Sequence, residues 1–452
     1  MAATKPALAH TSERGFILLL PTEYYLLGGA LAVAASFLIL LAIPADRLRR
    51  LTDARLGLGQ IRVPSETATS LASFAVLVVL LVAAYFGSRD PLANPLPLVV
   101  WTIWWVGLTL AHALFGNLWR HLNPWVGAYR LVRGIRPAPF VHRLGYWPGI
   151  IGLGAFAWFE LLHPAPDDPA ILAQAVVLYS VVTWIGMALF GEQTWLACGE
   201  AFSVFFSLIA RIAPLQSHPA EPGHRQFSLA IPGRALVELP PLPPSGILFV
   251  LLTLSTVSFD GLNKTFFWLA LGGVNPLEFP GRSAVMTFNS LGLVALWLGL
   301  SAIFLICVGI GWALAGKRQP FWPQAGALAA SILPIAIAYQ FAHYLTSFLV
   351  NIQYAAVAVT DPFARGWFEA DERMHTVTTS FLSNHAGVTL IWNLQAGGIV
   401  LGHVVAVLVA HLITLQRRTG RQEVLTSQAP LAALMVAYTI FGLWLLSTPA
   451  AG

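Results

Sequence analysis

Five polar side chains recur at helical spacing within the strongly apolar residues 323–350, and one of them is a histidine. They are Gln340, His343, Tyr344, Ser347 and Asn351. Offsets of three, four and seven residues place them on one side of a helix. Polar side chains at bilayer depth are costly, so they usually face a protein interior or a wet cavity. The stripe therefore predicts a buried site, in which His343 has the chemistry of an acid–base catalyst or metal ligand and the other four are binding groups.

A second polar group lies in residues 258–265, inside another apolar run. Asp260 has the chemistry of a general base, a metal ligand or a proton carrier, and Lys264 that of an anion or oxyanion contact. Gly261 and Asn263 favour a break in the helix at depth, which is tolerated where the backbone lines protein or water. Asn263 is then a further binding group. The alternative is an ion pair between Asp260 and Lys264 across one helical turn.

Residues 392–411 carry a third set, with Gln395, His403 and His411 eight residues apart. Eight residues rotate a side chain by about 80° and raise it by about 12 Å, so these three cannot form one tight ligand cluster. Gln395 as a binding group and His403 as a second metal ligand are nearest in depth to His343. His411 is expected at the membrane interface.

The composition places these groups in a membrane protein. Of 452 residues, 57% are hydrophobic and only 10% are charged, with a mean hydropathy of +0.71. An ordinary soluble domain carries about 25% charged residues. Repeated apolar runs predict an all-α, polytopic transmembrane helical bundle. We expect about ten spans, at residues 24–44, 68–87, 97–115, 146–163, 170–191, 245–272, 285–315, 322–350, 387–415 and 429–447.

Arginines concentrate in short loops, which indicates the cytoplasmic side of a membrane rather than a nucleic-acid partner, for which no motif is present. Residues 45–67 and 117–145 are the richest in arginine, and residues 317–318 and 417–421 mark two later helix ends. All four basic segments lie on the cytoplasmic side only if the chain crosses the membrane an even number of times between the fifth and sixth spans. Residues 194–213 are therefore expected to be re-entrant or interfacial, with an eleventh span as the alternative.

The proline-rich residues 214–244 are expected outside the membrane. They divide the chain into an N-terminal five-span half, 1–213, and a C-terminal five-span half, 245–452, which carries the three polar segments. The first apolar run is too long for a signal-peptide core, so we expect a retained span and a multi-pass protein of the bacterial inner membrane. Its surroundings are the lipid bilayer, and a partner subunit could complete the site.

Other polar residues of the apolar runs have plainer interpretations. His112 is expected to be a satisfied interior histidine. Glu160 is expected, with His163, to cap a span end or to face water. Glu192 and Glu200 flank the re-entrant segment and are expected to line a vestibule.

The long loop 352–386 also carries acids and histidines. Asp371 and His375 are four residues apart and could hold a divalent metal if the loop is helical. A solvated surface or a lid over the site is the alternative.

Several phrases resemble a bacterial family of polytopic membrane proteins labelled fenitrothion hydrolase. They are SFDGLNKT (258–265), AYQFAHYLTSFLVNIQ (338–353), DPFARGW (361–367), GHVVAVLVAH (402–411) and, less closely, HALFGNLWRHLNPW (112–125). The resemblance covers most of the C-terminal half and implies a membrane hydrolase that cleaves a phosphotriester and releases a phenol. Such a reaction usually needs a metal-activated water and a cationic stabiliser. The helices bearing Asp260, His343 and His403 would then converge, with Lys264 as the cation, and a small apolar or amphipathic substrate would enter from the lipid.

Two other functions fit the same residues. A proton-coupled transporter or solute-binding protein would use Asp260, His343 and Glu200 as proton carriers. An electron-transfer subunit with b-type haem or a quinone would use His343 and His403 as axial haem ligands. For the hydrolase, the expected cofactor is a divalent metal on these two histidines.

Overall fold

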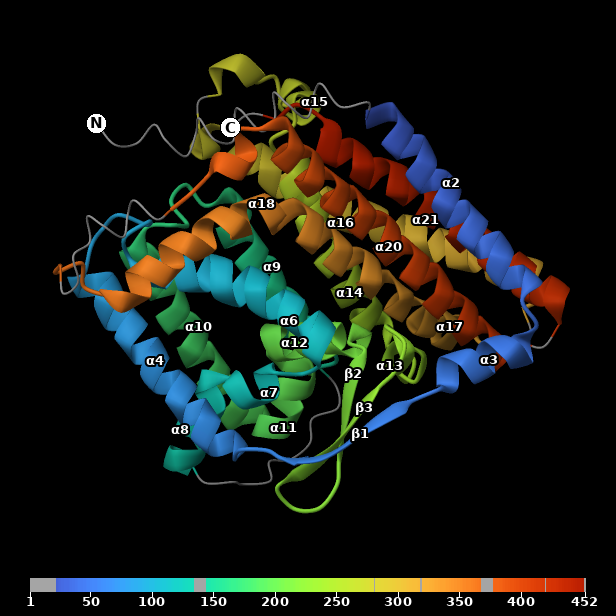
Figure 1. Ribbon diagram of the computed structural model, residues 1–452, viewed down its shortest axis with the longest axis horizontal. Helices are drawn as coiled ribbons and strands as arrows, with labels where there is room; N and C mark the ends of the chain where they lie inside the picture. The colour runs from blue at the N-terminus through green and yellow to red at the C-terminus, as the bar shows by residue number, and fades with distance from the viewer. Residues whose placement is uncertain are drawn as a thin grey trace.

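The computed structural model describes residues 22–133, 144–279, 281–317, 319–366, 377–418 and 420–450. Within them, nine helices or helix groups are long and apolar enough to cross a membrane. They are α2 (Thr22–Ala42), α4 (Glu66–Phe86), α5–η1–α6 (Pro95–Phe115), α10 (Pro169–Phe190), α14 (Pro244–Leu262), α16 (Arg282–Leu314), α17–η5–α18 (Phe321–Thr360), α20 (His385–Arg417) and α21 (Arg421–Ser447). Together they form one helical bundle (Figure 1), which confirms the all-α polytopic architecture of a multi-pass membrane protein.

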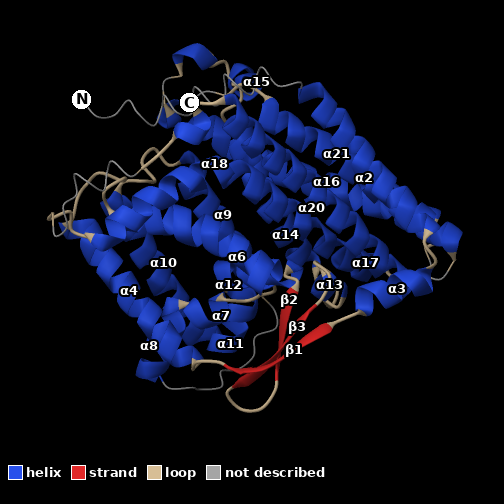
Figure 2. Ribbon diagram, in the orientation of Figure 1, coloured by secondary structure: helices blue, strands red, loops and turns tan. Residues whose placement is uncertain are grey.

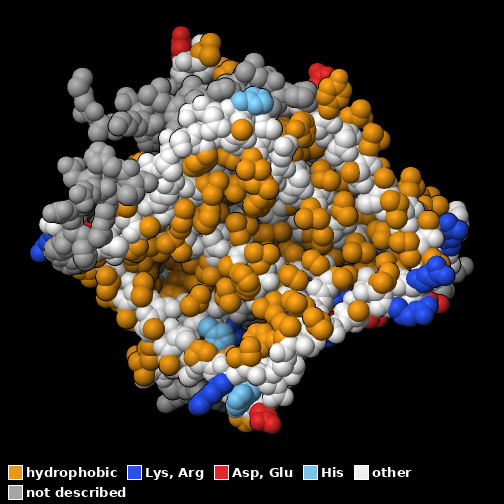
Figure 3. Space-filling view, in the orientation of Figure 1, with side chains coloured by type: hydrophobic (Ala, Val, Ile, Leu, Met, Phe, Trp, Pro, Cys, Tyr) orange, Lys and Arg blue, Asp and Glu red, His pale blue; other side chains and the backbone are white. Residues whose placement is uncertain are grey.

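The bundle is apolar on its outside and densely packed within. In α14 and in residues 321–360, 89% of the most apolar window is buried, against 22% in α4 and 28% in α16. The exposed side chains of the outer helices include many leucines, and orange hydrophobic atoms cover the middle of the face in Figure 3. Such a surface suits lipid. The helices α14 and α18 (Leu333–Thr360) are therefore central, and polar groups on them face protein.

Helix α9 (Trp147–Leu162) is the remaining predicted span, and its 16 residues make it the shortest. It packs along α14. At one end, the Tyr146 backbone N–H donates to Ser245 Oγ at 3.1 Å. At the other end, Glu160 of α9 and Asp260 of α14 contact the same tyrosine hydroxyl. The two helices are therefore parallel neighbours that cross the same layer.

A small sheet joins two segments that lie far apart in the sequence. Its strands are β1 (Leu56–Arg62), β2 (Leu215–Pro219) and β3 (His224–Leu229), in the antiparallel order β1–β3–β2 (Figure 2). Residues 214–244, expected as a stiff polar connection, thus pair with the arginine-rich segment 45–67. No local pattern in these two segments predicts the strands.

Residues 192–212 form a bent helix pair. The pair consists of α11–η2 (Glu192–Gly199) and α12–η3 (Ala201–Ile212), which meet at 66°. At its start, Glu192 binds Arg130 of α8 (Pro124–Arg133), which also donates to Thr67 Oγ1 at the start of α4. At its end, the chain enters β2, and β1 of the same sheet leads into α4. Both ends therefore adjoin segments that lead into α4, which favours a re-entrant course over a broken span.

The basic segments within the described residues lie at one end of the bundle. This end, which we name the arginine-rich face, comprises α3 (Ala45–Asp53), the sheet, α8 and the ends of α16 and α20. Arg49 of α3 donates to Leu415 O at 2.6 Å, and Arg418 donates to Ala315 O at 3.2 Å. Lys and Arg side chains gather over α3 and near the sheet in Figure 3. Residues 134–143 and Arg318 lie outside the described residues.

Glycines allow α18 and α20 to approach each other closely. A Cβ added at Gly402 of α20 would lie 2.3 Å from Ala338 Cβ and 2.7 Å from Pro334 O. At Gly398, one turn away, the added Cβ would lie 2.7 Å from a Phe341 ring carbon. The spacing of four residues therefore serves helix packing.

We expect Gly402→Ala to lower the free energy of unfolding by about 1–3 kcal/mol, because the added methyl group meets backbone and side-chain atoms that cannot withdraw. Gly397→Ala is the matched control, since an added Cβ there meets nothing within 4 Å. Thermal unfolding in detergent measures both variants. Equal losses of stability at the two positions would contradict the packing account.

Candidate functional site

The polar stripe of α18 meets two acidic side chains near the face opposite the arginines. Helix α14 ends at Leu262, and α15 (Phe266–Leu271) begins with Thr265 as its cap. The break predicted within residues 258–265 therefore exists, but it ends the span early, so the predicted span 245–272 is wrong at its end. This ending leaves Asp260 in the last turn of α14, where that helix packs against α18.

Four side chains form one hydrogen-bonded chain, which we name the acid chain: Glu160, Tyr344, Asp260 and His343. The Tyr344 hydroxyl oxygen lies 2.8 Å from Glu160 Oε1 and 2.6 Å from Asp260 Oδ2. His343 Nε2 lies 2.8 Å from the same Asp260 oxygen. Three helices contribute: α9 supplies Glu160, α14 supplies Asp260, and α18 supplies the adjacent pair of aromatic residues.

The number of protons in the acid chain follows from its geometry. A phenol has one hydrogen and can donate to only one of its two carboxyl neighbours. The other contact requires the carboxyl group to donate to the phenol oxygen, so either Glu160 or Asp260 carries a proton. Asp260 also accepts from His343, which favours the negative charge there. The chain then reads Glu160–H to Tyr344–H to Asp260, with His343 donating from the other side.

Two neighbouring members of the acid chain, Asp260 and His343, differ in their exposure. Asp260 is buried, with only 8% of its side chain exposed, whereas 35% of the His343 side chain is exposed. Gly261 adjoins the imidazole, because an added Cβ there would lie 3.9 Å from His343 Nδ1. His343 is therefore the member of the chain that can exchange a proton with its surroundings.

Two cationic side chains, Arg282 and Lys264, lie near the acid chain. Arg282, at the start of α16, donates from Nη1 to the backbone oxygens of Glu160 and His163, at 2.8 and 3.3 Å, and so caps α9. Lys264 is exposed, one turn beyond Asp260. Asp260 pairs with His343. The alternative prediction of an Asp260–Lys264 ion pair is therefore wrong.

The other predicted binding residues surround this chain or hold helices together. Gln340 and Asn263 are buried, and each has one side-chain atom, Nε2 and Oδ1 respectively, without a hydrogen-bond partner among the described residues. Ser347 donates to Tyr344 O of its own helix, and Gln395 Nε2 donates to Ala342 O, which ties α20 to α18. Asn351 is partly buried two turns beyond Tyr344.

His403 lies in different surroundings from His343. Its Nδ1 lies 2.9 Å from Ile399 O, and its ring centroid lies 6.1 Å from that of Tyr339 and 6.4 Å from that of Tyr438. Among the described residues, no three His, Cys, Asp or Glu side chains are grouped to hold a metal ion. The structure therefore does not bring His343 and His403 into a metal centre.

Glu160 is the site residue whose role was misjudged. It was expected to cap a span end or face water, but it is bonded to Tyr344. The available signal is positional, since Glu160 and Asp260 each lie two residues before the end of a helix. Using that signal requires knowing that α9 and α14 are parallel neighbours.

Three other polar residues have structural roles. Glu200 caps α12 (Ala201–Ile209), accepting from Phe202 N and Ser203 N at 2.9 and 2.7 Å. Tyr179 also donates to it, and Glu200 is buried, so the expectation that it lines a vestibule is wrong. His112 is a satisfied interior histidine, as expected: Nδ1 lies 2.6 Å from Leu108 O, and Nε2 accepts from Trp119 N at 2.8 Å.

Two further predictions concern His411 and the loop pair Asp371 and His375. His411 is buried within the bundle and lies 3.1 Å from Gln428 Oε1, and its expected position at the membrane interface stays a prediction. Asp371 and His375, the loop pair with metal-ligand spacing, lie outside the described residues.

Comparisons of the chain with protein-family models, with curated proteins and with solved structures find no match. The family resemblance of residues 258–265 and 338–353 stays a prediction. We therefore infer the function of the protein from the geometry of the acid chain.

Proposed function

We propose that the protein is a proton-coupled transporter of the bacterial inner membrane, in which the acid chain carries the coupling proton and a small polar solute is the cargo. The observation that supports this most is the continuous contact of four titratable side chains within a membrane bundle. Ionisable groups in membrane spans are expensive and commonly belong to proton relays.

Proton transfer along the acid chain needs only small movements of hydrogen. Glu160 gives its proton to the Tyr344 oxygen while Tyr344 gives its own to Asp260, so one O–H bond breaks and one forms at each step. Asp260 passes this proton to His343 Nε2 when the ring hydrogen lies on Nδ1, which then releases it, so one N–H bond forms at Nε2 as another breaks at Nδ1. The exposed side of His343 is the entry and exit point.

Irregular helices beside the acid chain support movement as part of the function. The π-helix η1 (Val99–Leu108) packs against α18, and its Trp105 contacts Phe156 of α9 at 4.6 Å between ring centroids. The re-entrant pair 192–212 packs on α9 and contacts α18. π-Helical segments and broken helices recur at functional sites of membrane proteins, where they line binding sites and gates.

The proposal predicts proton entry coupled to solute entry. Proteoliposomes would contain a pH-sensitive dye, and a deproteinised small-molecule extract of bacterial cells would be added outside. We expect the wild-type protein to acidify the lumen on addition of the extract, and Asp260→Asn to lower that initial rate by about 10²-fold, the size of effect typical for loss of a positioned acid–base group.

Glu278→Gln is the control, because Glu278 is an exposed carboxyl group on the 3₁₀ turn η4 (Pro276–Glu278) before α16. It should retain the wild-type rate. The proposal fails if the extract acidifies wild-type and Asp260→Asn vesicles at the same rate.

A phosphotriester hydrolase is the second candidate, and the Asp260–His343 pair favours it. Asp260 orients the imidazole through Nε2, which leaves Nδ1 to take a proton from an attacking water. Purified protein would be assayed for nitrophenol release with and without a chelator. Release that survives the chelator fits this general-base route, release that the chelator abolishes fits a metal, and no release eliminates the hydrolase. Facing imidazoles are needed for a bis-histidine haem, whereas His343 faces Asp260 and His403 lies against two tyrosines, so we do not propose haem binding.

A further inference from the structure

A second cluster of buried polar side chains lies one turn nearer the arginine-rich face than the acid chain. Its members are Ser258 of α14, Tyr339 of α18, His403 of α20 and Tyr438 of α21. Ser258 Oγ lies 2.6 Å from the Tyr438 hydroxyl oxygen, and the Tyr339 hydroxyl donates to Tyr438 O at 2.7 Å. Tyr339 precedes His343 by one helical turn. The cluster therefore adjoins the acid chain on the side toward the arginines.

The proton on the His403 ring can be placed. Its Nδ1 lies 2.9 Å from Ile399 O, and a carbonyl only accepts, so Nδ1 carries the hydrogen. Nε2 is then an acceptor, yet it is fully buried and has no donor among the described residues. His112 shows the contrast, because it makes the same carbonyl contact and its Nε2 accepts from Trp119 N.

The neighbouring hydroxyl groups already donate elsewhere. Ser258 donates to Leu254 O at 2.8 Å, so the hydrogen between Ser258 and Tyr438 comes from Tyr438. Tyr339 donates to the Tyr438 backbone. Both phenol oxygens can still accept. A proton bound at His403 Nε2 would convert this unsatisfied buried acceptor, which is costly to leave unpaired, into a donor, and the neighbouring phenol oxygens keep the capacity to accept.

We propose that His403 Nε2 is a second proton-binding position, which receives the proton from the acid chain on its way toward the arginine-rich face. This inference rests on the proposed transport function. The transfer forms one N–H bond at His403 and breaks one N–H or O–H bond in the acid chain, with no change of oxidation state. His403 is then a carrier of protons rather than a packing residue.

The surroundings suit a transient charge. The titratable groups that face His403 are Tyr339 from α18 and Tyr438 from α21. Of the other elements packed on α20, α2 has its ionisable residues only at its start, residues 23–25, and α17 (Phe321–Ala329) and η5 (Ala330–Ile332) have none. The only charged residue of α13 (Arg234–Val237) is Arg234, which pairs with acids outside the bundle. Among the described residues of these elements, no carboxylate faces the ring, so a bound proton can leave.

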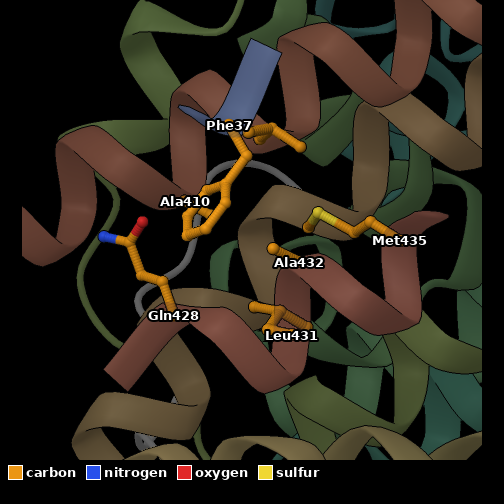
Figure 4. A pocket seen from close by; sticks show the side chains of 7 residues that line it. Phe37, Ala410, Gln428, Leu431, Ala432 and Met435 are labelled. Atoms are coloured by element: carbon orange, nitrogen blue, oxygen red, sulfur yellow. The ribbon is translucent and has the colours of Figure 1, made fainter. Parts of the chain in front are cut away.

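Small cavities continue from this cluster toward the arginine-rich face. One of about 10 Å³ adjoins Tyr438 and Met435. Another of about 10 Å³ lies farther along, where Phe37 of α2, Ala410 of α20 and Met435 of α21 line it together with Gln428 (Figure 4). Each is too small for more than one water molecule. Gln428, which lines the second, contacts His411.

The proteoliposome assay tests this inference with His403→Asn and His403→Gln, whose amides stay polar but do not titrate. We expect extract-driven acidification to fall at least about 10-fold in both, while the infrared band of the protonated carboxyl group persists and shows that the acid chain is intact. His385→Asn, an exposed histidine at the start of the same helix, is the control and should match wild type.

Wild-type rates in either folded His403 variant, with Asp260→Asn still inactive, would overturn the inference and leave the transport proposal standing. If the wild-type protein itself gives no acidification, the transport proposal fails and His403 is judged by infrared titration. An imidazole protonation band present in wild type and lost in both variants would then support a proton-binding histidine, and identical titrations would overturn it.

Discussion

Tyr344→Phe should reduce extract-driven acidification of proteoliposomes by about 10²-fold, because it removes the oxygen atom that contacts both carboxyl groups. The Tyr344 oxygen lies within hydrogen-bonding distance of both Glu160 and Asp260. Phenylalanine keeps the ring but cannot pass a proton. The initial rate of dye response, measured at equal protein incorporation, gives the result.

Tyr354→Phe is the matched control, since Tyr354 lies farther along α18 and packs against apolar residues. It should match the wild-type rate. Infrared spectra add a second readout: the protonated-carboxyl band should shift in Tyr344→Phe and disappear in Glu160→Gln. A Tyr344→Phe variant with an unshifted band and a normal rate would show that the acid chain is not the proton path.

Arg130→Ala should lower the free energy of unfolding by about 3 kcal/mol, because it leaves a largely buried carboxylate without its partner. The Arg130 guanidinium contacts both oxygens of Glu192, and only 20% and 11% of these two side chains are exposed. It also donates to Thr67 at 3.0 Å. The loss therefore releases the start of the re-entrant pair from α8 and α4.

Arg120→Ala provides the comparison, since the Arg120–Glu66 pair is more exposed, at 48% and 31%. A surface pair contributes about 0–1 kcal/mol. Unfolding in detergent with increasing dodecyl sulfate measures both variants. Similar small losses would mean that the Arg130–Glu192 pair does not hold the re-entrant segment.

The sequence alone predicts the helical bundle well, because each membrane span is recognised from the length of its own apolar run. The arginine clusters also predict that residues 194–213 return to the side they left, since charge bias acts on every loop separately. The spacing from Gln340 to Asn351 predicts a polar face because helical periodicity is local.

The sequence-based predictions that fail are those that depend on which helices and strands are neighbours. Glu160 acquires its role only because α9 lies parallel to α14, and no local pattern in residues 147–162 reports that. The strand β1 pairs with β3 across more than 160 residues (Leu56 with Leu229), and the two segments separately look like polar loops. Likewise, Lys264 was the nearer partner for Asp260 in sequence, whereas His343 is nearer in space.

The acid chain joins two parts of the polypeptide, one before and one after the β2–β3 hairpin in the sequence. Glu160 comes from the segment before β2, and its three partners come from the segment after β3. A slide of α9 by two residues, about 3 Å along its axis, would lengthen the 2.8 Å contact between Glu160 and Tyr344 beyond hydrogen-bonding distance. The proton held by the acid chain therefore depends on the position of α9 relative to α14 and α18. Any movement that shifts α9 along these two helices makes or breaks the hydrogen-bonded chain.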